Sequence, residues 1–347
     1  MTRDGSIGAF LARSGFGGAA TSPLAQDASF RRYLRLSGGP RPAVLMDAPP
    51  PEDIRPFLRI AAHLRAAGLS VPDIIAADET NGLLLEEDLG DQLLSALIDR
   101  ATRNGSDTIP VPSGLFPSGP FPSGPFEAAV DALVVMQRAS PPDGLPEWDS
   151  AAMARAALGT LFDWWWPAMF GAPAPDEARA DVAAALDEVL QPIAVGPRCF
   201  VHRDFFAGNL IWMPDRSGAR RTGIIDFQGA AIGHPAYDLA SLLQDARRDI
   251  PATTADAALD RYLRARPDLD PIGFRAAYDA CAAQRHLRVA CQWVRLAKRD
   301  GRPQYLAFGP RTWQLLQSAL TRPAVAALAG ALDRWIPLDR RCNPPGI

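Results

Sequence analysis

The residues best suited to chemistry stand on two short segments in the second half of the chain. His202-Arg203-Asp204 is followed by Asn209, five residues after Asp204, and Asp226 stands 17 residues after Asn209. A carboxylate can accept the proton of an attacking hydroxyl, and carboxylate and amide oxygens are ligands that suit Mg²⁺. Transfer of a phosphoryl group from ATP needs these groups and few others. We therefore assign Asp204 as the catalytic base, and Asn209 and Asp226 as ligands of Mg²⁺.

Both acidic segments follow apolar runs that are typical of buried strands. Residues 199–201 lead into the first segment, and residues 222–227 contain the second as a short predicted strand. The spacing H-R-D-x-x-x-x-N, followed by D-F-x, is that of the catalytic and metal-binding loops of the protein-kinase-like fold, and a strand context supports such a motif. The alternative is a buried turn network of His202, Arg203 and Asp204 without chemistry.

These segments resemble the aminoglycoside phosphotransferase and choline kinase superfamily, whose small-molecule kinases share the protein-kinase fold. A narrower resemblance is to the bacterial anomeric kinases of N-acetylmuramate and N-acetylglucosamine. It spans roughly residues 20 to 310, and four stretches carry it: residues 26–35 (QDASFRRYLR), 44–50 (VLMDAPP), 87–90 (EDLG) and 284–289 (QRHLRV).

The resemblance implies an α+β fold of two lobes. We expect residues 1–90 to form a small antiparallel-sheet lobe that binds nucleotide and ends in a hinge, and residues 91–347 to form a mainly helical lobe with the catalytic loop, the metal loop and the acceptor site. It also implies an ATP-dependent kinase that phosphorylates the anomeric hydroxyl of N-acetylmuramate or N-acetylglucosamine for peptidoglycan recycling. Ser29, in the phosphate loop, and Glu87 and Leu89, in the hinge, would contact ATP.

The ATP phosphates require a cation, and this chain lacks the usual one. Most kinases of this fold use a lysine on the third strand, but Lys298 is the only lysine and Met46 stands at the corresponding position. We therefore expect Arg31, Arg32 or Arg35 to hold the phosphates, since arginine forks suit phosphate oxygens. Alternate residues of a strand share a face, so Arg31 and Arg35 face one way and Arg32 the other. The sequence leaves open which of them faces ATP, or whether all three are solvated.

Asp238 follows the metal loop in a G-x-P-x-x-D-L-A run, residues 233–240. In the related family this run opens a helix. We expect Asp238 to be a buried acceptor that holds the catalytic loop, through Arg203 or backbone amides, rather than a catalytic group. His202 and Arg203 belong to the same structural support.

Two further sets of residues are candidates for the acceptor site. Trp165, in the run of three tryptophans 164–166, could stack on a sugar ring, or it packs helices together. Arg285 and Arg288 are three residues apart and share a helix face. They suit the lactyl carboxylate of N-acetylmuramate, or they form a structural ion pair or a solvated face.

The elements that must position these residues can be predicted from apolar spacing. In the first lobe we predict strands at 29–37, 42–47, 74–77 and 83–87, with helices at 5–16 and 52–67. In the second lobe we predict helices at 127–139, 150–170, 176–190, 236–248, 252–266, 272–299, 310–320 and 322–335.

Residues 101–126 differ from their surroundings. A five-residue unit of Pro, Ser, Gly and Phe recurs three times in residues 112–126. Proline and glycine break helix and sheet, so we interpret 101–126 as a flexible surface insertion. It is either a substrate lid or an expansion without function.

Composition excludes several classes of protein. The net charge of −3 comes with no basic stripe, which argues against nucleic-acid binding. No apolar run approaches the roughly 18 residues of a membrane span, and the first residues lack the apolar core of a secretory signal. Four scattered cysteines fit a reduced, cytoplasmic setting. We expect a monomer whose partners are ATP and a small sugar.

Two other functions stay open. One is another kinase of the superfamily, acting on an aminoglycoside, choline or homoserine. The other is a pseudokinase that binds nucleotide without chemistry. The missing strand lysine favours the pseudokinase, whereas the presence of Asp204, Asn209 and Asp226 opposes it.

Overall fold

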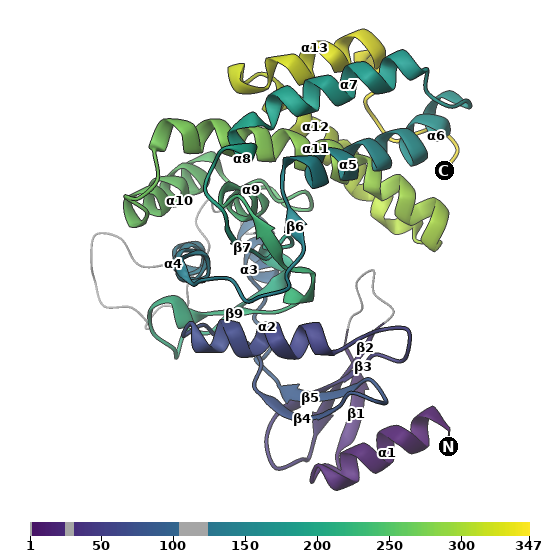
Figure 1. Cartoon of the computed structure of the whole chain (residues 1–347). Coiled ribbons are helices and arrows are strands. Elements are labelled where there is room, and N and C mark those ends of the chain that lie inside the picture. Colours follow the sequence, from purple (N-terminus) through teal and green to yellow (C-terminus); the bar gives the residue numbers. More distant parts are fainter. Residues whose placement is uncertain (1, 25–30, 104–123) are drawn as a thin grey trace.

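The computed structural model describes residues 2–24, 31–103 and 124–347. Figure 1 shows two parts, one built around a five-stranded antiparallel sheet and a larger one that is mostly helical. The expected α+β, protein-kinase-like fold is confirmed.

The sheet has the strand order β1-β2-β3-β5-β4, and every neighbouring pair is antiparallel. Its strands are β1 (Ala20–Pro23), β2 (Arg32–Ser37), β3 (Ala43–Asp47), β4 (Ile74–Asp78) and β5 (Leu83–Glu87). Sequence analysis missed β1, a short strand whose four residues are all exposed and therefore show no apolar alternation.

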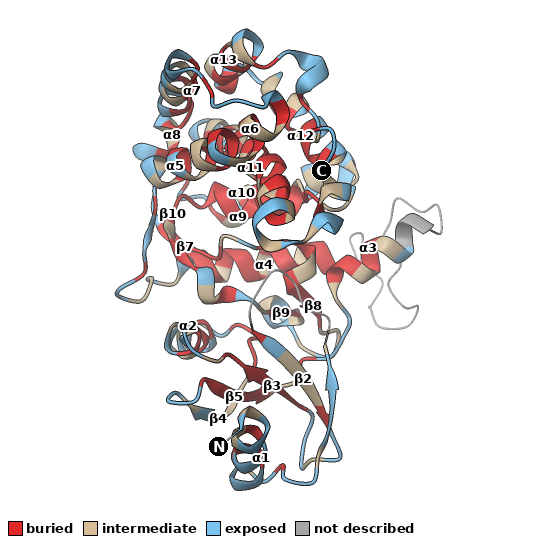
Figure 2. Ribbon diagram, turned by 90° about the vertical axis from the view of Figure 1, so that its right-hand side faces the viewer, coloured by how far each residue is buried: buried red, intermediate tan, exposed pale blue. Residues whose placement is uncertain are grey.

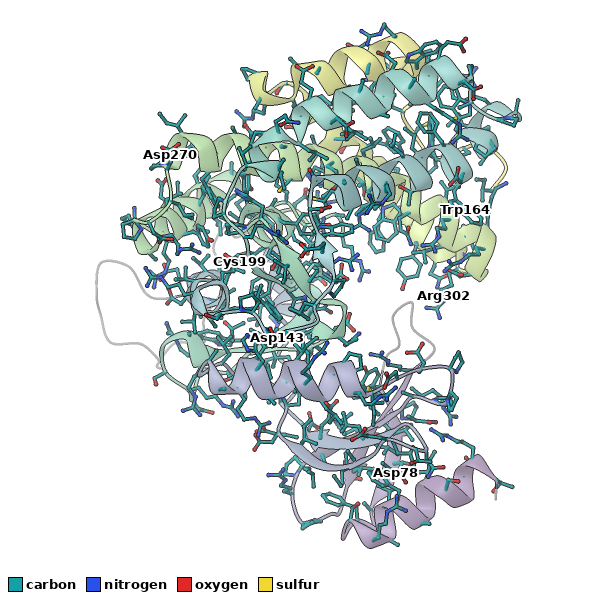
Figure 3. All side chains as sticks on the ribbon, viewed as in Figure 1. Asp78, Asp143, Trp164, Cys199, Asp270 and Arg302 are labelled. Carbon is teal, nitrogen blue, oxygen red and sulfur yellow. The ribbon has the colours of Figure 1, made fainter. Side chains whose placement is uncertain are left out.

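Two helices cover opposite faces of this sheet (Figure 1). Helix α1 (Arg3–Arg13) packs Phe10 on Leu45 and Leu85 of one face. Helix α2 (Arg55–Ala66) shares a second core with Met46 and Leu84 of the other face. Because neighbouring strand residues point to opposite sides, these cores fix which side chains of β2, β3 and β5 face the helical part. Figure 3 shows Asp78 beside α1, where it pairs with Arg13.

The larger part consists of helices around a few short strands. The helices are α3 (Leu94–Arg103), α4 (Pro125–Arg138), α5 (Ser150–Thr160), α6 (Trp166–Phe170), α7 (Asp176–Val189), α8 (Gln191–Ala194), α9 (Ala236–Leu243), α10 (Ala252–Ala265), α11 (Pro271–Asp300), α12 (Gly309–Leu320) and α13 (Ala326–Trp335). Figure 2 shows that α4 and much of α11 are buried at its centre.

Short strands position the two acidic segments. β6 (Glu147–Trp148), β10 (Ala231–Gly233) and β7 (Cys199–Val201) form one small sheet, and β8 (Leu210–Trp212) pairs with β9 (Thr222–Ile224). The catalytic segment therefore leaves β7, as the apolar run predicted. The metal segment leaves β9, but this strand ends at Ile224, so Asp226 lies beyond it and not within the strand predicted at 222–227.

Three other predicted elements differ from the structure. The helix expected at 150–170 is interrupted by a π-helical turn, Leu161–Trp165, because Pro167 has no N–H for an α-helical bond. The helix expected at 236–248 ends at Leu243. The predicted insertion 101–126 is too long, since α3 continues to Arg103 and α4 begins at Pro125. Proline is tolerated in the first turn of a helix because that N–H has no helical partner. The rest of the insertion, 104–123, lies outside the described residues.

In the described parts of the chain, no single helix is both long and apolar enough to cross a membrane. One bent pair, Pro303–Leu320 with Pro323–Trp335, meets that test by length and composition alone. The four cysteines are free.

Candidate active site

The catalytic segment forms a tight loop after β7. Asp204 is exposed, whereas His202 before it is fully buried. Arg203 has a φ of 72° and Asp226 a φ of 62°, and they are the only non-glycine residues with positive φ among those described. Such strain persists where the surroundings enforce it, and it is frequent at functional sites. Both acidic loops thus contain a strained backbone conformation of the kind that is frequent at functional sites.

Asp238 enforces the first of these conformations. Its carboxylate accepts the backbone N–H of His202 at 2.6 Å and that of Arg203 at 2.9 Å. The side chain is fully buried at the start of α9. Burial raises the pKa of Asp238 to about 6, while the neighbouring His202 and the two N–H bonds oppose the rise. Asp238 therefore contacts the catalytic loop through backbone amides, which is one of the two contacts expected from the sequence.

His202 connects the catalytic loop to the metal loop. Its Nε2 lies 3.0 Å from the Ile225 carbonyl oxygen, and its Nδ1 lies 3.3 Å from the backbone N of Asp204. These partners place the proton on Nε2, so that Nδ1 accepts the N–H of Asp204. Burial lowers the pKa of His202 and keeps the ring neutral. The chain segments before Asp204 and before Asp226 are thereby fixed relative to each other.

Asn209 completes the centre. Its Nδ2 donates to the backbone carbonyl of Asp204 at 3.0 Å and lies 3.4 Å from Oδ2 of Asp226. Gln228 donates to the other carboxylate oxygen of Asp226 at 2.7 Å. The structure thus brings Asp204, Asn209 and Asp226 to one place, with both carboxylates exposed.

This donor set fits a magnesium ion. One carboxylate and one amide oxygen are few ligands, but Mg²⁺ takes one or two carboxylates from a protein and the rest from phosphates and water. In the described chain, no cluster of three or more His, Cys, Asp or Glu side chains offers another metal site.

The metal loop also contacts the sheet-bearing part. Phe227, next to Asp226, packs on Phe57 of α2 with ring centroids 4.5 Å apart. Both rings are buried. The position of Asp226 therefore depends on where α2 lies.

Comparison with known proteins agrees with this geometry. Residues 20–272 match the model of the phosphotransferase enzyme family. The chain belongs to this family. It is 35% identical to the N-acetylmuramate/N-acetylglucosamine kinase of Caulobacter vibrioides, over 98% of both chains.

Two solved structures share its fold. A choline/ethanolamine kinase family protein from Mesorhizobium loti superposes with a TM-score of 0.60 at 15% identity, over 96% of this chain and 100% of that one. A variant of aminoglycoside phosphotransferase APH(4)-Ia, in complex with ADP and hygromycin B, gives 0.55 at 17% identity, over 90% and 98%. At these identities the likeness shows the fold alone.

In this phosphotransferase, the three candidate arginines have different surroundings. Arg31 is 8% exposed, and its Nε donates to Glu52 at 3.0 Å. It also hydrogen-bonds to Tyr33, whose pKa is raised by burial and by the charges of Glu86 and Asp226. Arg31 is therefore the candidate that lies on the same side as the metal loop.

Arg32 and Arg35 have other partners. Arg32 points to the α1 face, where its Nε donates to the buried Asp47 at 2.9 Å, and Arg3 of α1 shares that carboxylate at 2.8 Å. Arg35 pairs with Asp88 at 2.7 Å. Because Asp47 holds it on the face away from the helical part, Arg32 is not part of the site that we propose. Ser29 lies outside the described residues.

The hinge candidates lie at the end of β5. The Glu87 carboxylate pairs with Arg216 at 3.0 Å and accepts the N–H of Asp73 at 3.2 Å, so its side chain is occupied by protein groups. Leu89 is 9% exposed. Contacts to a nucleotide through the backbone of Glu87 and Leu89 stay a prediction.

The two sets of candidates for the acceptor site have different surroundings. Trp165 is fully buried, donates to the Cys342 carbonyl at 2.9 Å and packs on Trp313 with centroids 5.1 Å apart. It therefore has no free face for a sugar. Its neighbour Trp164 is partly exposed at the outer side of the helical part (Figure 3).

Arg285 and Arg288 lie near Asp204. Arg285 is 5% exposed, and Asp204 is among the charges that act on both guanidinium groups. Arg288 donates to the Tyr237 hydroxyl at 3.2 Å. Neither arginine forms an ion pair with a described residue, so the expected alternatives of an ion pair and of a solvated face do not apply to Arg285.

Sequence reasoning missed several residues of the site. Glu52 is the partner of Arg31, Gln228 orients Asp226, and Tyr237 holds Arg288. Only Gln228 had a local signal, since it directly follows Asp226-Phe227. The other two contacts join segments far apart in the sequence, which periodicity and motif spacing do not report.

Proposed function

We propose that this phosphotransferase transfers the γ-phosphoryl group of ATP to the anomeric hydroxyl of N-acetylmuramate and N-acetylglucosamine. The observation that carries the proposal is the 35% identity, over nearly the full length, to a kinase named for these sugars. The exposed Asp204 beside Asn209 and Asp226 supports it. Release of a sugar 1-phosphate suits a role in peptidoglycan recycling.

In this proposal Asp204 acts as the general base. Its carboxylate is exposed, and His202 and Asn209 hold its backbone, so it can take the proton of the attacking hydroxyl. An anomeric hydroxyl is more acidic than an ordinary alcohol, so a weak base suffices. The transition state is loose, and most of the rate then comes from placement and charge neutralisation.

Asn209 and Asp226 hold Mg²⁺ in this proposal. The ion, when bound with ATP, would neutralise charge on the β- and γ-phosphates. Gln228 keeps Asp226 oriented for this purpose. Arg31, paired with Glu52, approaches the phosphates in place of the missing strand lysine.

The first test is the pair of variants Asp204→Asn and Asp226→Asn. For Asp204→Asn we expect a loss of kcat of about 10²- to 10⁴-fold with both sugars and an unchanged Kd for ATP, since a general base acts only on the acceptor. For Asp226→Asn we expect a loss of the magnesium-dependent step, as in wild-type protein treated with a chelator. Near-normal turnover in either variant would refute the assignment.

A panel of acceptors tests the substrate class. It comprises N-acetylmuramate, N-acetylglucosamine, choline, homoserine and an aminoglycoside, each with ATP and Mg²⁺. We expect transfer to the two N-acetyl sugars. ATP binding without transfer to any acceptor would instead support the pseudokinase. A division of the chain at residue 90, a cytoplasmic location and a monomeric state remain part of this proposal.

A further inference from the structure

Two arginines of α11, the buried Arg285 and the partly buried Arg288, lie next to the catalytic loop with buried hydrogen-bonding groups that are unused among the described residues. Nε and Nη1 of Arg285 and Nε of Arg288 are buried and have no hydrogen-bond partner. A guanidinium group stays charged in a protein, and a buried charge without a counter-ion is costly. Such an arrangement is expected where a ligand supplies the missing anion.

Among residues 2–24, 31–103 and 124–347, no carboxylate forms an ion pair with Arg285 or Arg288. Asp245 is the other carboxylate whose charge acts on Arg285, but it accepts the backbone N–H of Arg247 at 2.8 Å and does not bond to Arg285. Asp204 acts on both arginines, yet it forms no ion pair with either of them, and it remains exposed. The two positive groups therefore lie near the exposed carboxylate of Asp204 without an ion pair to it.

The second arginine is held in place by its neighbours. Arg288 donates to the Tyr237 hydroxyl, and its guanidinium lies 5.9 Å from the centroid of Trp148. Arg203 lies over the same indole at 4.0 Å. Because Arg203 directly precedes Asp204, Trp148 connects the arginine pair to the catalytic loop.

The nucleotide phosphates are less suitable as this anion. The charge of Asp226 acts on Tyr33, and Tyr33 hydrogen-bonds to Arg31. Arg31 therefore lies on the side of the metal loop. Asp204 is among the charges that act on both Arg285 and Arg288. Arg31 is thus associated with the metal loop, and Arg285 and Arg288 with the catalytic carboxylate.

We propose that Arg285 and Arg288 form an anion subsite on the acceptor side of Asp204 that binds a carboxylate of the acceptor sugar. This inference rests on the proposed function. N-acetylmuramate carries a carboxylate on its lactyl ether, and N-acetylglucosamine has a hydroxyl at that position. Arginine forks bind carboxylates through paired hydrogen bonds, so the subsite gives the acidic sugar an advantage in kcat/KM.

The test compares both sugars in wild type and in Arg288→Gln. We expect kcat/KM for N-acetylmuramate to fall about 10- to 100-fold, as for loss of a charged hydrogen bond, and kcat/KM for N-acetylglucosamine to change by less than about threefold. Tyr237→Phe keeps the charge and removes only the hydroxyl that holds Arg288, so it should cause a smaller loss with the same selectivity. Arg295→Gln, farther along α11, is the matched control.

Equal losses with both sugars would overturn the subsite, because they would mean that the pair serves the transferred phosphoryl group or the fold. No loss with either sugar would overturn it as well.

Calorimetric binding of each sugar without nucleotide separates failure of the subsite from failure of the proposed function. If wild type phosphorylates neither sugar but binds N-acetylmuramate, and Arg288→Gln does not bind it, the subsite stands and the function falls. If both sugars are phosphorylated with an unchanged preference in Arg288→Gln, the function stands and the subsite falls.

Discussion

Arg31 is the residue that we propose in place of the missing strand lysine. The third strand offers Met46, which is fully buried and has no charge, whereas Arg31 is paired with Glu52 just before α2. A cation paired to an acid near that helix is the arrangement that the strand lysine gives in other kinases of the fold. In the function that we propose, the cation comes from the segment just before β2 instead of from β3.

We predict that Arg31→Met raises the KM for ATP about 10- to 100-fold, because a charged hydrogen bond to phosphate is worth roughly 1.5–3 kcal/mol. The fold should persist, since the Glu52 side chain is partly exposed and can be solvated. Initial rates at varied ATP measure the effect. Arg41→Gln, an exposed arginine in the turn between β2 and β3, serves as the control, and an unchanged KM in Arg31→Met would remove Arg31 from the site.

At the scale of elements, the catalytic loop depends on its contact with α9. Asp238 is the acceptor for two buried backbone N–H groups, and one of them belongs to a residue with positive φ. A buried donor that loses its acceptor costs about 1–3 kcal/mol. The helix therefore stabilises a loop conformation that the backbone would not adopt by itself.

We predict that Asp238→Ala lowers the free energy of unfolding by about 2–5 kcal/mol, since it leaves both N–H groups unpaired. Denaturation with urea, followed by fluorescence, measures the change. Glu188→Ala, at an exposed position of α7, should change stability by less than about 0.5 kcal/mol. A cost for Asp238→Ala as small as that of the control would show that the loop does not need this acceptor.

At the scale of the whole molecule, one buried acid makes stability depend on pH. Glu86 of β5 is 5% exposed, it shares its face with Leu84, and its Oε2 has no hydrogen-bond partner. Burial, and secondarily the charge of Asp88, raises its pKa to about 8. Between about pH 4.5 and 8 the folded chain holds a proton that the unfolded chain has released, so the contribution of Glu86 to stability falls as pH rises through this window.

We predict that Glu86→Gln, which cannot ionise, becomes more stable relative to wild type as pH rises from 5 to 8. The difference should grow by up to about 1.4 kcal/mol per pH unit and level off above pH 8. Urea midpoints of both proteins across this range provide the measurement. A difference that stays constant between pH 5 and 8 would mean that Glu86 ionises normally in the folded protein.

Local spacing along the chain was enough to predict the candidate catalytic centre and most of the elements. Asp204, Asn209 and Asp226 stand on short loops next to strands, and such local spacing is enough to bring them together. Long amphipathic helices such as α2 and α11 were predictable because their apolar residues recur with the period of the helix.

The residues around that centre could be assigned only from contacts between distant segments. Strand alternation predicted that Arg31 and Arg32 face opposite ways, but only their contacts with Glu52 and Asp47 show which of them lies on the side of the metal loop. Trp165, the predicted sugar contact, is buried against Trp313, whereas its neighbour Trp164 is partly exposed. These outcomes depend on partners that lie far away in the sequence, and spacing along a chain carries no information about which distant group completes a contact.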